Sequence, residues 1–366
     1  MGAPAKRFVK VLLGQTLGRT GLWDRILRMW AQRHSTIVLS YHRVIEKWDR
    51  TLDYSQPGMT VTIATFDRQL SFLKEQFDIV PLGSLLTEGN IDRPASRARC
   101  VITFDDGWRD NYDLAFPVLR KHDIPATIFL TTDFIGTDRA FWHTELIYLL
   151  LRTELSQLTR DGIMSRPHPS PVHHHLKRWD RTGRVSCAHD VDPVIETVKA
   201  MCDEDAIEEL IHSFTQAGGL LRPLFAERKF FLDWDQVREM VASGIEIGSH
   251  GCSHRMLTRL STDEAEAELV RSKAEIESRL GRIVQHFAFP NEAANGPLLT
   301  LAARAGYRTA CLSGGGPKEG QFGIRALRRL GMHEEACGGG PSFDEALLRF
   351  WLFRAPKSRP AWVPSV

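Results

Sequence analysis

The chain has 366 residues, of which 43% are hydrophobic and 25% are charged. These proportions are typical of a soluble globular protein and argue against a disordered or fibrous one. Six cysteines without any Cys-x-x-Cys pair exclude a disulfide scaffold and a zinc ribbon, and they fit a reducing, cytoplasmic compartment. No stretch approaches the roughly 20 apolar residues that a membrane span requires. The net charge of +2 is uneven, because residues 1–34 hold seven basic residues against one acidic residue.

The basic N-terminal segment, residues 1–34, also carries apolar residues at roughly helical spacing, among them Phe8, Trp23 and Trp30. A helix lying on an anionic membrane, at its inner face, has this pattern. A basic surface helix that packs on the domain has it too, so both interpretations stay open. The segment lacks the apolar run and cleavage site of a secretion signal. Nucleic-acid binding is not expected, because the basic residues concentrate in a terminal segment and do not spread over a folded face.

Strand-like runs alternate with helical patterns over residues 35–139 and 231–335. The expected strands are 36–41, 78–82, 100–104, 126–130, 245–248, 286–289 and 309–312. One helix is expected after an N-cap at Thr65, another is kinked or restarted by Pro117, and two more begin with capping boxes at Asp233 and Ser261. Single strands alternating with helices predict parallel α/β architecture, and polar residues that follow successive strands predict a (β/α) barrel.

Residues 140–230 interrupt this alternation. Helical patterns at 146–158 and 196–214 surround a His/Pro-rich segment, 167–175. Because the alternation resumes afterwards, we predict a helical insertion that forms a lid or subdomain. The run His173-His174-His175 predicts a surface loop and not a metal site, since no acidic or cysteine partner stands at ligand spacing. Residues 336–366 are expected to form a C-terminal tail helix.

Two pairs of polar residues carry the chemistry that the sequence predicts. Asp105 and Asp106 end the expected strand 100–104, and His250 and His254 follow the expected strand 245–248. Neighbouring side chains on an extended backbone point to opposite faces, so one aspartate can bind a metal while the other handles a proton. An aspartate with two imidazoles leaves a divalent metal one open position. The alternatives are a solvated Asp-Asp-Gly turn and a His-x-x-x-His pair that arises by chance among 14 histidines.

The two stretches that contain these pairs, 103–107 (TFDDG) and 249–254 (SHGCSH), resemble the first two motifs of the polysaccharide deacetylase family. This family is carbohydrate esterase family 4, with the NodB-like homology domain, and the resemblance covers about residues 36–135 and 231–335. It implies a distorted (β/α) barrel that hydrolyses N-acetyl groups on sugars with a zinc-type divalent ion. It also implies that Asp106, His250 and His254 are the metal ligands and that Asp105 is the general base.

The third motif of this family departs from its usual form. Where the family often has Arg-Pro-Pro-Tyr-Gly, this chain has AFPNE at 288–292. Pro290 is kept, but Ala288 replaces the arginine that would tune the base and Glu292 replaces the glycine. The backbone N–H of Asn291 can still serve as an oxyanion donor, because that role needs no particular side chain. The pattern therefore leaves the pKa of Asp105 without a controlling arginine.

An early histidine is the candidate general acid. The stretch 41–44 (YHRV) resembles the Tyr-His motif of a subgroup associated with exopolysaccharide synthesis. The family's usual Leu-His stretch near the C-terminus is not evident, and His333 is expected to be a surface residue. A sugar amine is a poor leaving group until it is protonated, so we expect His42 to supply that proton. The alternative is a histidine that is hydrogen-bonded at a strand end.

These observations predict an enzyme, an N-deacetylase that acts on a glycan containing N-acetylhexosamine, either a polysaccharide or a lipid-linked precursor. A carbohydrate O-acetyl esterase would use the same site on a different bond. A catalytically weakened glycan-binding protein is the alternative from another class, and the altered third motif is what suggests it.

Overall fold

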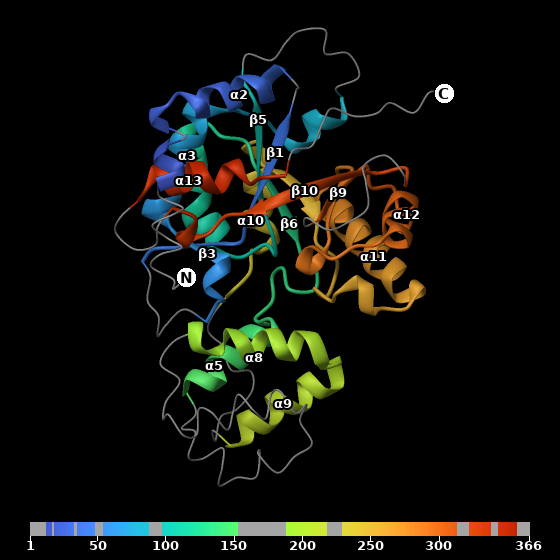
Figure 1. Ribbon diagram of the computed structural model, residues 1–366. Helices are drawn as coiled ribbons and strands as arrows, with labels where there is room; N and C mark the ends of the chain where they lie inside the picture. Colours follow the sequence, from blue (N-terminus) through green and yellow to red (C-terminus); the bar gives the residue numbers. More distant parts are fainter. Residues whose placement is uncertain are drawn as a thin grey trace. The chain divides into compact units, whose positions relative to one another are not determined.

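The computed structural model describes residues 12–16, 18–32, 35–47, 54–87, 97–152, 188–217, 229–312, 322–337 and 343–356. The chain divides into two compact units (Figure 1). The first comprises 1–46, 58–137 and 231–366, and the second comprises 47–57 and 138–230. None of the helices in the described part of the chain is long and apolar enough to cross a membrane.

Seven parallel strands close into a barrel in the first unit (Figure 1). Their order around the barrel is β1 (Thr36–Tyr41), β10 (Arg325–Gly331), β9 (Thr309–Leu312), β8 (His286–Ala288), β7 (Glu246–Ser249), β6 (Thr127–Leu130) and β5 (Arg99–Phe104). The barrel closes because β5 pairs with β1 along six residues. A short strand, β4 (Asp78–Ile79), pairs with the start of β5, while β6 pairs with its end. The predicted distorted (β/α) barrel is confirmed, and the carboxyl ends of its strands meet at one rim.

Helices between the strands begin at residues whose side chains cap the first turn, except for the helix that contains Pro117. They are α3 (Ile63–Gln76), α4 (Phe116–His122), α10 (Trp234–Ala242), α11 (Thr262–Leu280) and α12 (Gly296–Arg304). The capping boxes at Asp233 and Ser261 are confirmed at the starts of α10 and α11. The expected cap at Thr65 is wrong: Thr62 is the N-cap of α3, and its hydroxyl accepts the Thr65 N–H. Pro117 restarts a helix, because it lies in the first turn of α4, directly after a π-helical turn over Asn111–Ala115.

Two strands differ from their expectation. The expected strand 78–82 is only β4, and a 3₁₀ turn over Leu82–Leu86 follows it. Strand β10 was not predicted at all, because its sequence RALRRLG contains three arginines and shows no regular alternation of apolar and polar residues. A further parallel pair lies apart from the barrel sheet and consists of β2 (Arg43–Ile45) and β3 (Thr60–Thr62).

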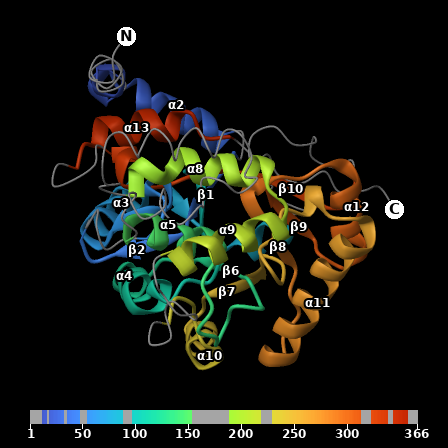
Figure 2. The same ribbon diagram turned by 90° about the horizontal axis from the view of Figure 1, so that it is seen from below.

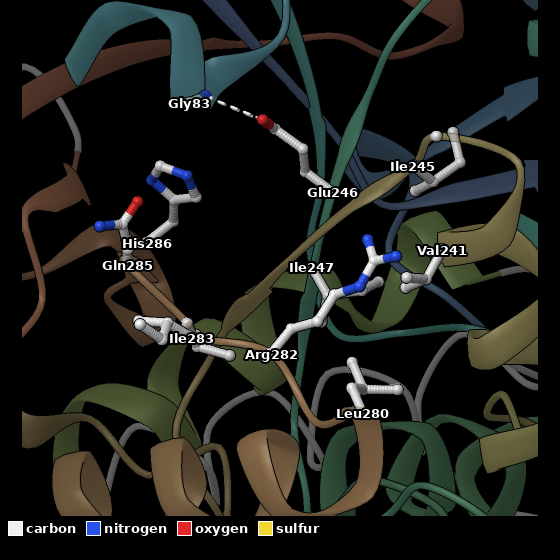
Figure 3. A pocket seen from close by; sticks show the side chains of 12 residues that line it. Gly83, Val241, Ile245, Glu246, Ile247, Leu280, Arg282, Ile283, Gln285 and His286 are labelled. Carbon is white, nitrogen blue, oxygen red and sulfur yellow. Dashed lines mark hydrogen bonds between the residues drawn. The ribbon is translucent and has the colours of Figure 1, made fainter. Parts of the chain in front are cut away.

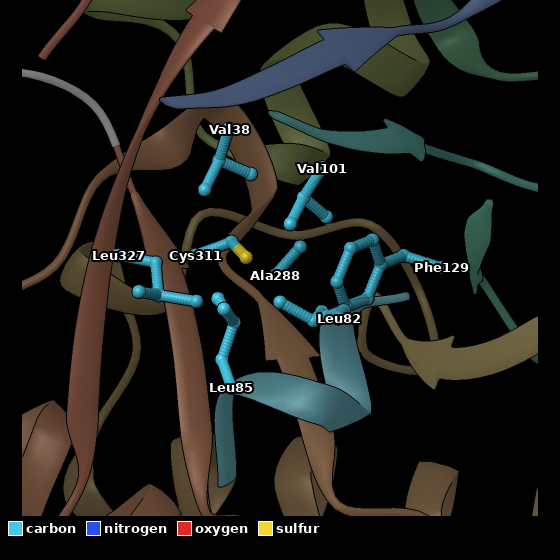
Figure 4. Packing of buried hydrophobic residues seen from close by; sticks show 8 residues of the cluster. All are labelled: Val38, Leu82, Leu85, Val101, Phe129, Ala288, Cys311 and Leu327. Carbon is cyan, nitrogen blue, oxygen red and sulfur yellow. The ribbon is translucent and has the colours of Figure 1, made fainter. Parts of the chain in front are cut away.

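The barrel interior is filled by side chains from the strands and is plugged at the amino ends of the strands. Six strand residues and two residues of the 3₁₀ turn pack together (Figure 4): Val38, Val101, Phe129, Ala288, Cys311, Leu327, Leu82 and Leu85. The turn lies at the amino ends of the strands, since the Gly83 N–H donates to the carboxylate of Glu246, the first residue of β7. The opposite rim is therefore the end of the barrel at which polar side chains can gather.

A pocket of about 240 Å³ opens beside this plugged end (Figure 3). Its walls include Glu246 and His286. The Glu246 carboxylate already accepts hydrogen bonds from Gly83 and from the Thr127 hydroxyl. Burial lowers the pKa of His286 to about 4, so its imidazole is neutral. This pocket lies at the amino ends of β7 and β8 and is separate from the rim that carries Asp105 and Asp106.

The N-terminal helix α2 (Leu22–Gln32) packs on the barrel unit with one apolar face. Trp23, Ile26 and Trp30 are buried, and the Trp23 indole N–H donates to the Gln76 side chain of α3 at 2.9 Å. Helix α13 (Glu345–Phe353) approaches the residues that precede α2, since a Cβ on Gly14 would meet the Ala346 backbone (Figure 2). The packing interpretation of the basic segment therefore holds for this face of the helix.

The second unit is helical and contains α5 (Trp142–Arg152), α8 (Ala188–Met201) and α9 (Glu204–Ala217). The pattern expected as one helix over 196–214 is thus divided between α8 and α9. The segment 47–57 belongs to this unit, and there Tyr54 packs edge-on against Tyr148 with ring centroids 5.1 Å apart. The His/Pro-rich segment 167–175, with its three consecutive histidines, lies outside the described residues.

Candidate metal centre and catalytic site

Backbone strain concentrates at the carboxyl rim of the barrel. Five non-glycine residues in the described part of the chain have a positive φ, and four of them are Asp106 (75°), His254 (63°), Asn291 (53°) and Glu292 (54°). Left-handed backbone is unfavourable for side chains other than glycine, and it persists only where the surrounding structure imposes it. All four lie in stretches that the sequence motifs mark, so the strain coincides with the candidate site.

Three of the predicted side chains converge on one point. Asp106 Oδ1 lies 3.3 Å from His250 Nε2 and 3.2 Å from His254 Nε2. The three ligand atoms lie within 4.8 Å of one another. Asp106 is fully buried and His250 nearly so, whereas the His254 side chain is 12% exposed. Strand ends β5 and β7 thus bring together residues that are more than 140 positions apart in the chain.

The hydrogen bonds around this cluster suit a metal ion. His250 Nδ1 lies 2.8 Å from the Ala288 carbonyl, so Nδ1 carries the proton and the neutral ring presents a lone pair at Nε2. The Trp108 indole N–H donates to Asp106 Oδ2 at 2.7 Å, which leaves Oδ1 facing the imidazoles. That oxygen is buried and has no hydrogen-bond donor. Electron pairs that face one another in this way fit a shared divalent cation.

Charge around the cluster favours the deprotonated aspartate. Burial alone would raise the pKa of Asp106, but the imidazoles of His254 and His250 hold it well below its usual range. Burial opposes a charged ring at His250, yet the carboxylates of Asp105 and Asp106 raise the pKa of His250 above its ordinary value. A bound cation would replace that proton, because metal binding requires the neutral imidazole.

The other aspartate, Asp105, is paired with an arginine from a distant strand. Arg329 of β10 donates from Nη1 to Asp105 Oδ1 at 2.7 Å and from Nη2 to Oδ2 at 2.6 Å. Both side chains are at most 1% exposed. Burial alone would raise the pKa of Asp105, but Arg329, His250 and His42 together lower it below its usual value. The arginine missing from position 288 is thus supplied by Arg329, and the expectation that the pKa of Asp105 lacks a controlling arginine is wrong.

The altered third motif reaches the same arginine. Glu292 Oε1 lies 3.2 Å from Arg329 Nη2, and the Glu292 side chain is 25% exposed. Pro290, two residues after the end of β8, is buried, and Asn291 is exposed. The residue that replaces the family's glycine therefore places a second carboxylate on the guanidinium that holds Asp105.

His42 also lies at this rim, directly after β1. Its Nε2 is 3.8 Å from Asp105 Oδ2, and its side chain is 24% exposed. The backbone carbonyl of His42 accepts a hydrogen bond from the Asn111 amide at 2.7 Å. The structure therefore brings all the predicted site residues to one end of the barrel. His333, which was expected at the surface, is half-buried and packs edge-on against Trp351 with centroids 5.1 Å apart.

Two residues of the site escaped the sequence analysis. Trp108 directly follows the Asp-Asp-Gly turn but was given no role, and Arg329 stood in no recognised element. The sequence held one weak signal for Arg329, namely a pair of arginines inside a strand-length run that also contains Ala326, Leu327 and Leu330. A buried arginine in such a run needs a carboxylate partner.

Comparison with known proteins gives a family match and several similar folds. The family model described as polysaccharide deacetylase matches residues 92–310, more than half of the chain. A poly-beta-1,6-N-acetyl-D-glucosamine N-deacetylase of Staphylococcus epidermidis is 29% identical over 169 residues, which is 44% of this chain and 56% of that protein. A putative polysaccharide deacetylase, YxkH of Bacillus subtilis, is 49% identical over 77 residues, 21% of this chain and 24% of that protein. The chain thus matches little more than half of the first relative's length and about a quarter of the second's.

The fold has solved relatives as well. The structure of IcaB from Ammonifex degensii superposes with a TM-score of 0.52 and 16% identity, and the match covers 87% of this chain and 96% of that one. At that identity the likeness concerns the fold alone.

Proposed function

Because the chain belongs to the polysaccharide deacetylase family, whose members are hydrolases of carbon–nitrogen amide bonds, we propose that it is a metal-dependent N-deacetylase. Its proposed substrate is a glycan that contains N-acetylglucosamine, and the name of the Staphylococcus epidermidis relative supports that class. The observation that carries the proposal is the convergence of Asp106 Oδ1 on the Nε2 atoms of His250 and His254, next to a second aspartate that Arg329 holds in place.

The three ligands would hold a zinc-type divalent ion. When bound, such an ion lowers the pKa of a water molecule and polarises a carbonyl oxygen. Trp108 and the Ala288 carbonyl fix the orientation of Asp106 and His250 through their hydrogen bonds. The ligands are therefore oriented by the protein before any ion arrives, which favours tight binding.

Asp105 would act as the general base. Arg329 occupies one lone pair on each Asp105 oxygen and keeps the carboxylate ionised. Each oxygen retains a second lone pair, so the carboxylate can still accept a proton from the attacking water. The fixed bidentate geometry also keeps the base from rotating.

His42 would deliver a proton to the leaving amine. The His42 side chain is partly exposed. Its Nε2 lies close to Asp105 Oδ2 but beyond hydrogen-bond distance. A partly exposed imidazole at the rim can reach a bound sugar amide, and an imidazole can both carry a proton and release it to a leaving group. The Asn291 backbone N–H is proposed as the oxyanion donor.

The two alternatives differ in what supports them. The weakened-enzyme alternative drew on the lost arginine and the lost glycine of the third motif. Arg329 takes the place of the arginine beside Asp105, whereas Glu292 still stands where the family has glycine. The O-acetyl esterase alternative uses the same residues, but a sugar alkoxide depends less on prior protonation to leave than a sugar amine does, so a histidine in the position of His42 favours the amide.

Acetate release from matched substrates tests the proposal. The zinc-loaded protein is incubated with N-acetylglucosamine oligomers and with an O-acetylated sugar, and acetate and free amine are measured. Asp67→Ala is the matched control for Asp106→Ala, because it removes a carboxylate that pairs with Lys121 away from the site. We expect amide hydrolysis that disappears in Asp106→Ala and persists in Asp67→Ala. Hydrolysis of the ester alone would indicate an esterase, and retention of the glycan without acetate release would indicate a binding protein.

We also propose that the N-terminal helices contact an anionic membrane, at the cytoplasmic face. Eight large hydrophobic side chains of the described residues are exposed, and four of them lie in the N-terminal residues: Leu12, Leu13, Leu22 and Met29. Exposed Arg19, Arg25 and Arg28 stand among them. Apolar side chains interleaved with arginines suit the interface of a bilayer that carries anionic lipids. This face is distinct from the buried face of Trp23 and Trp30.

A further inference from the structure

We propose that Glu268 is a positioning residue of the metal centre, and this inference rests on the proposed metal site. Glu268 lies on α11, 15 positions after Ser253, and only 7% of it is exposed. Its Oε2 accepts the backbone N–H of Cys252 at 2.6 Å and that of Ser253 at 3.0 Å, while its Oε1 accepts the Ser253 hydroxyl at 2.6 Å. One carboxylate thus holds the segment between the two histidine ligands.

The segment needs such a partner because of its backbone conformation. Gly251 (φ 83°) and His254 (φ 63°) both have left-handed backbone. The Cys252 and Ser253 N–H groups point together toward one side, and consecutive N–H groups that converge in this way bind an anionic oxygen. Without the carboxylate these donors would lack a partner in a largely buried environment.

The opposite side of the segment is held by carbonyl contacts. The Thr132 N–H donates to the Gly251 carbonyl at 3.1 Å, and the Asp133 N–H donates to the Cys252 carbonyl at 3.0 Å. The segment is therefore clamped between the turn that follows β6 and the Glu268 side chain. The clamp sets the direction in which the chain leaves Ser253, and with it the position of His254 Nε2 relative to Asp106.

Gly251 shows how closely the carboxylate approaches. A Cβ at this position would lie 2.9 Å from Glu268 Oε2, and the left-handed φ would strain any other residue as well. The absence of a side chain at Gly251 thus lets the carboxylate reach both N–H groups.

A carboxylate elsewhere on α11 provides a matched control. Glu277 accepts the Val284 backbone N–H at 2.8 Å and pairs with Lys273 at 2.8 Å. It anchors a loop to the same helix as Glu268 does, but that loop leads into β8 and carries no predicted metal ligand. Removing Glu277 reports the general effect of losing a carboxylate that anchors a loop.

The test measures metal binding without substrate, so that it is independent of deacetylase activity. Zn²⁺ affinity is measured by competition with a chromophoric chelator, and ligand geometry by the absorption spectrum of Co²⁺, for the full chain and for Glu268→Ala, Glu268→Gln and Glu277→Ala. We expect Glu268→Ala to weaken Zn²⁺ binding about 10–100-fold and to alter the Co²⁺ spectrum. Glu268→Gln should restore most of the affinity, because its amide oxygen can accept both N–H groups and its amide N–H can donate to the Ser253 hydroxyl. Glu277→Ala should lower the melting temperature and leave both metal readouts unchanged.

The opposite results overturn the proposal. Native Zn²⁺ affinity in folded Glu268→Ala refutes it, as does a loss in Glu277→Ala of equal size. Failure of Glu268→Gln to restore affinity would show that charge and not position is responsible. If Glu268→Ala folds poorly, Glu268→Asp draws the carboxylate back by one C–C bond and should weaken binding in the same direction. If Asp106→Ala loses Zn²⁺ and the Glu268 variants do not, the positioning role of Glu268 is rejected and the metal site stands. If Asp106→Ala still binds Zn²⁺, the metal site itself is rejected.

Discussion

Replacing Arg329 by methionine should destabilise the barrel unit strongly at pH 8. The substitution keeps an unbranched side chain of comparable length but leaves the Asp105 carboxylate, which is only 1% exposed, without its bidentate partner. Breaking a buried ion pair by removing one member costs about 3–5 kcal/mol, since the remaining charge stays buried and uncompensated. We expect a loss of that size in Arg329→Met. Arg329→Met combined with Asp105→Asn removes both charges, and the double variant should lose at least about 2 kcal/mol less than the sum of the single losses.

The pH dependence should change sign with the substitution. In the native chain the pKa of Asp105 is lowered, so its contribution to stability is present above the ordinary pKa of a free aspartate and is lost as pH falls through the lowered value. In Arg329→Met, burial becomes the dominant influence and raises the pKa of Asp105. Its contribution is then present at low pH and is lost as pH rises through the raised value. Relative to the native chain, the variant should therefore be closer to native stability at pH 5 than at pH 8.

Hydrogen exchange of backbone amides in β5 and β10 is the suitable measurement. It reports the opening free energy of the barrel unit alone, which is necessary because a chain of two compact units need not unfold in one step. The protein is studied without metal, so that ligand binding does not contribute. Additive losses in the double variant, or an equal loss at pH 5 and pH 8, would refute the assignment of Arg329 as the partner that keeps Asp105 ionised.

The remaining predictions concern the site and the N-terminal helices. Asp106→Ala, like alanine at either histidine ligand, should lose bound zinc and activity while hydrogen exchange in the barrel stays slow; full zinc occupancy would contradict the ligand assignment. Asp105→Asn should keep the metal and lose turnover, and loss of metal would mean that the two aspartates have exchanged roles. His42→Ala should bind metal normally and lose kcat on an amide by roughly 10²–10⁴-fold, but far less on an activated acetyl ester; equal losses would argue against the acid role. Leu22→Glu should reduce binding to phosphatidylserine vesicles, whereas Ile283→Glu, at a side chain 79% exposed elsewhere, should not; equal vesicle binding by both variants would leave only the packing role of α2.

The barrel and most of its site could be predicted from local sequence. Each strand that was recognised is a short apolar run, and each helix start that was predicted correctly has a side chain that caps its own backbone, as Asp233 and Ser261 do. Such signals act within a few residues, so they can be recognised from the sequence alone. The positions of Asp106 and His250 follow in the same way, because parallel strands of a barrel must present their carboxyl ends at one rim.

The partner of the base was decided by tertiary structure alone. Arg329 is 224 positions from Asp105, and it comes from a strand that the sequence pattern does not reveal. Strand β1 separates β10 from β5 in the barrel, and Val38 pairs with Arg329 on one side and with Val101 on the other. Arg329 is therefore level with Val101, four residues before Asp105, and its long side chain spans this offset inside the closed barrel to reach the carboxylate. Register between distant strands is set by packing of the whole barrel, so the residues around Pro290 carry no sign of this arginine.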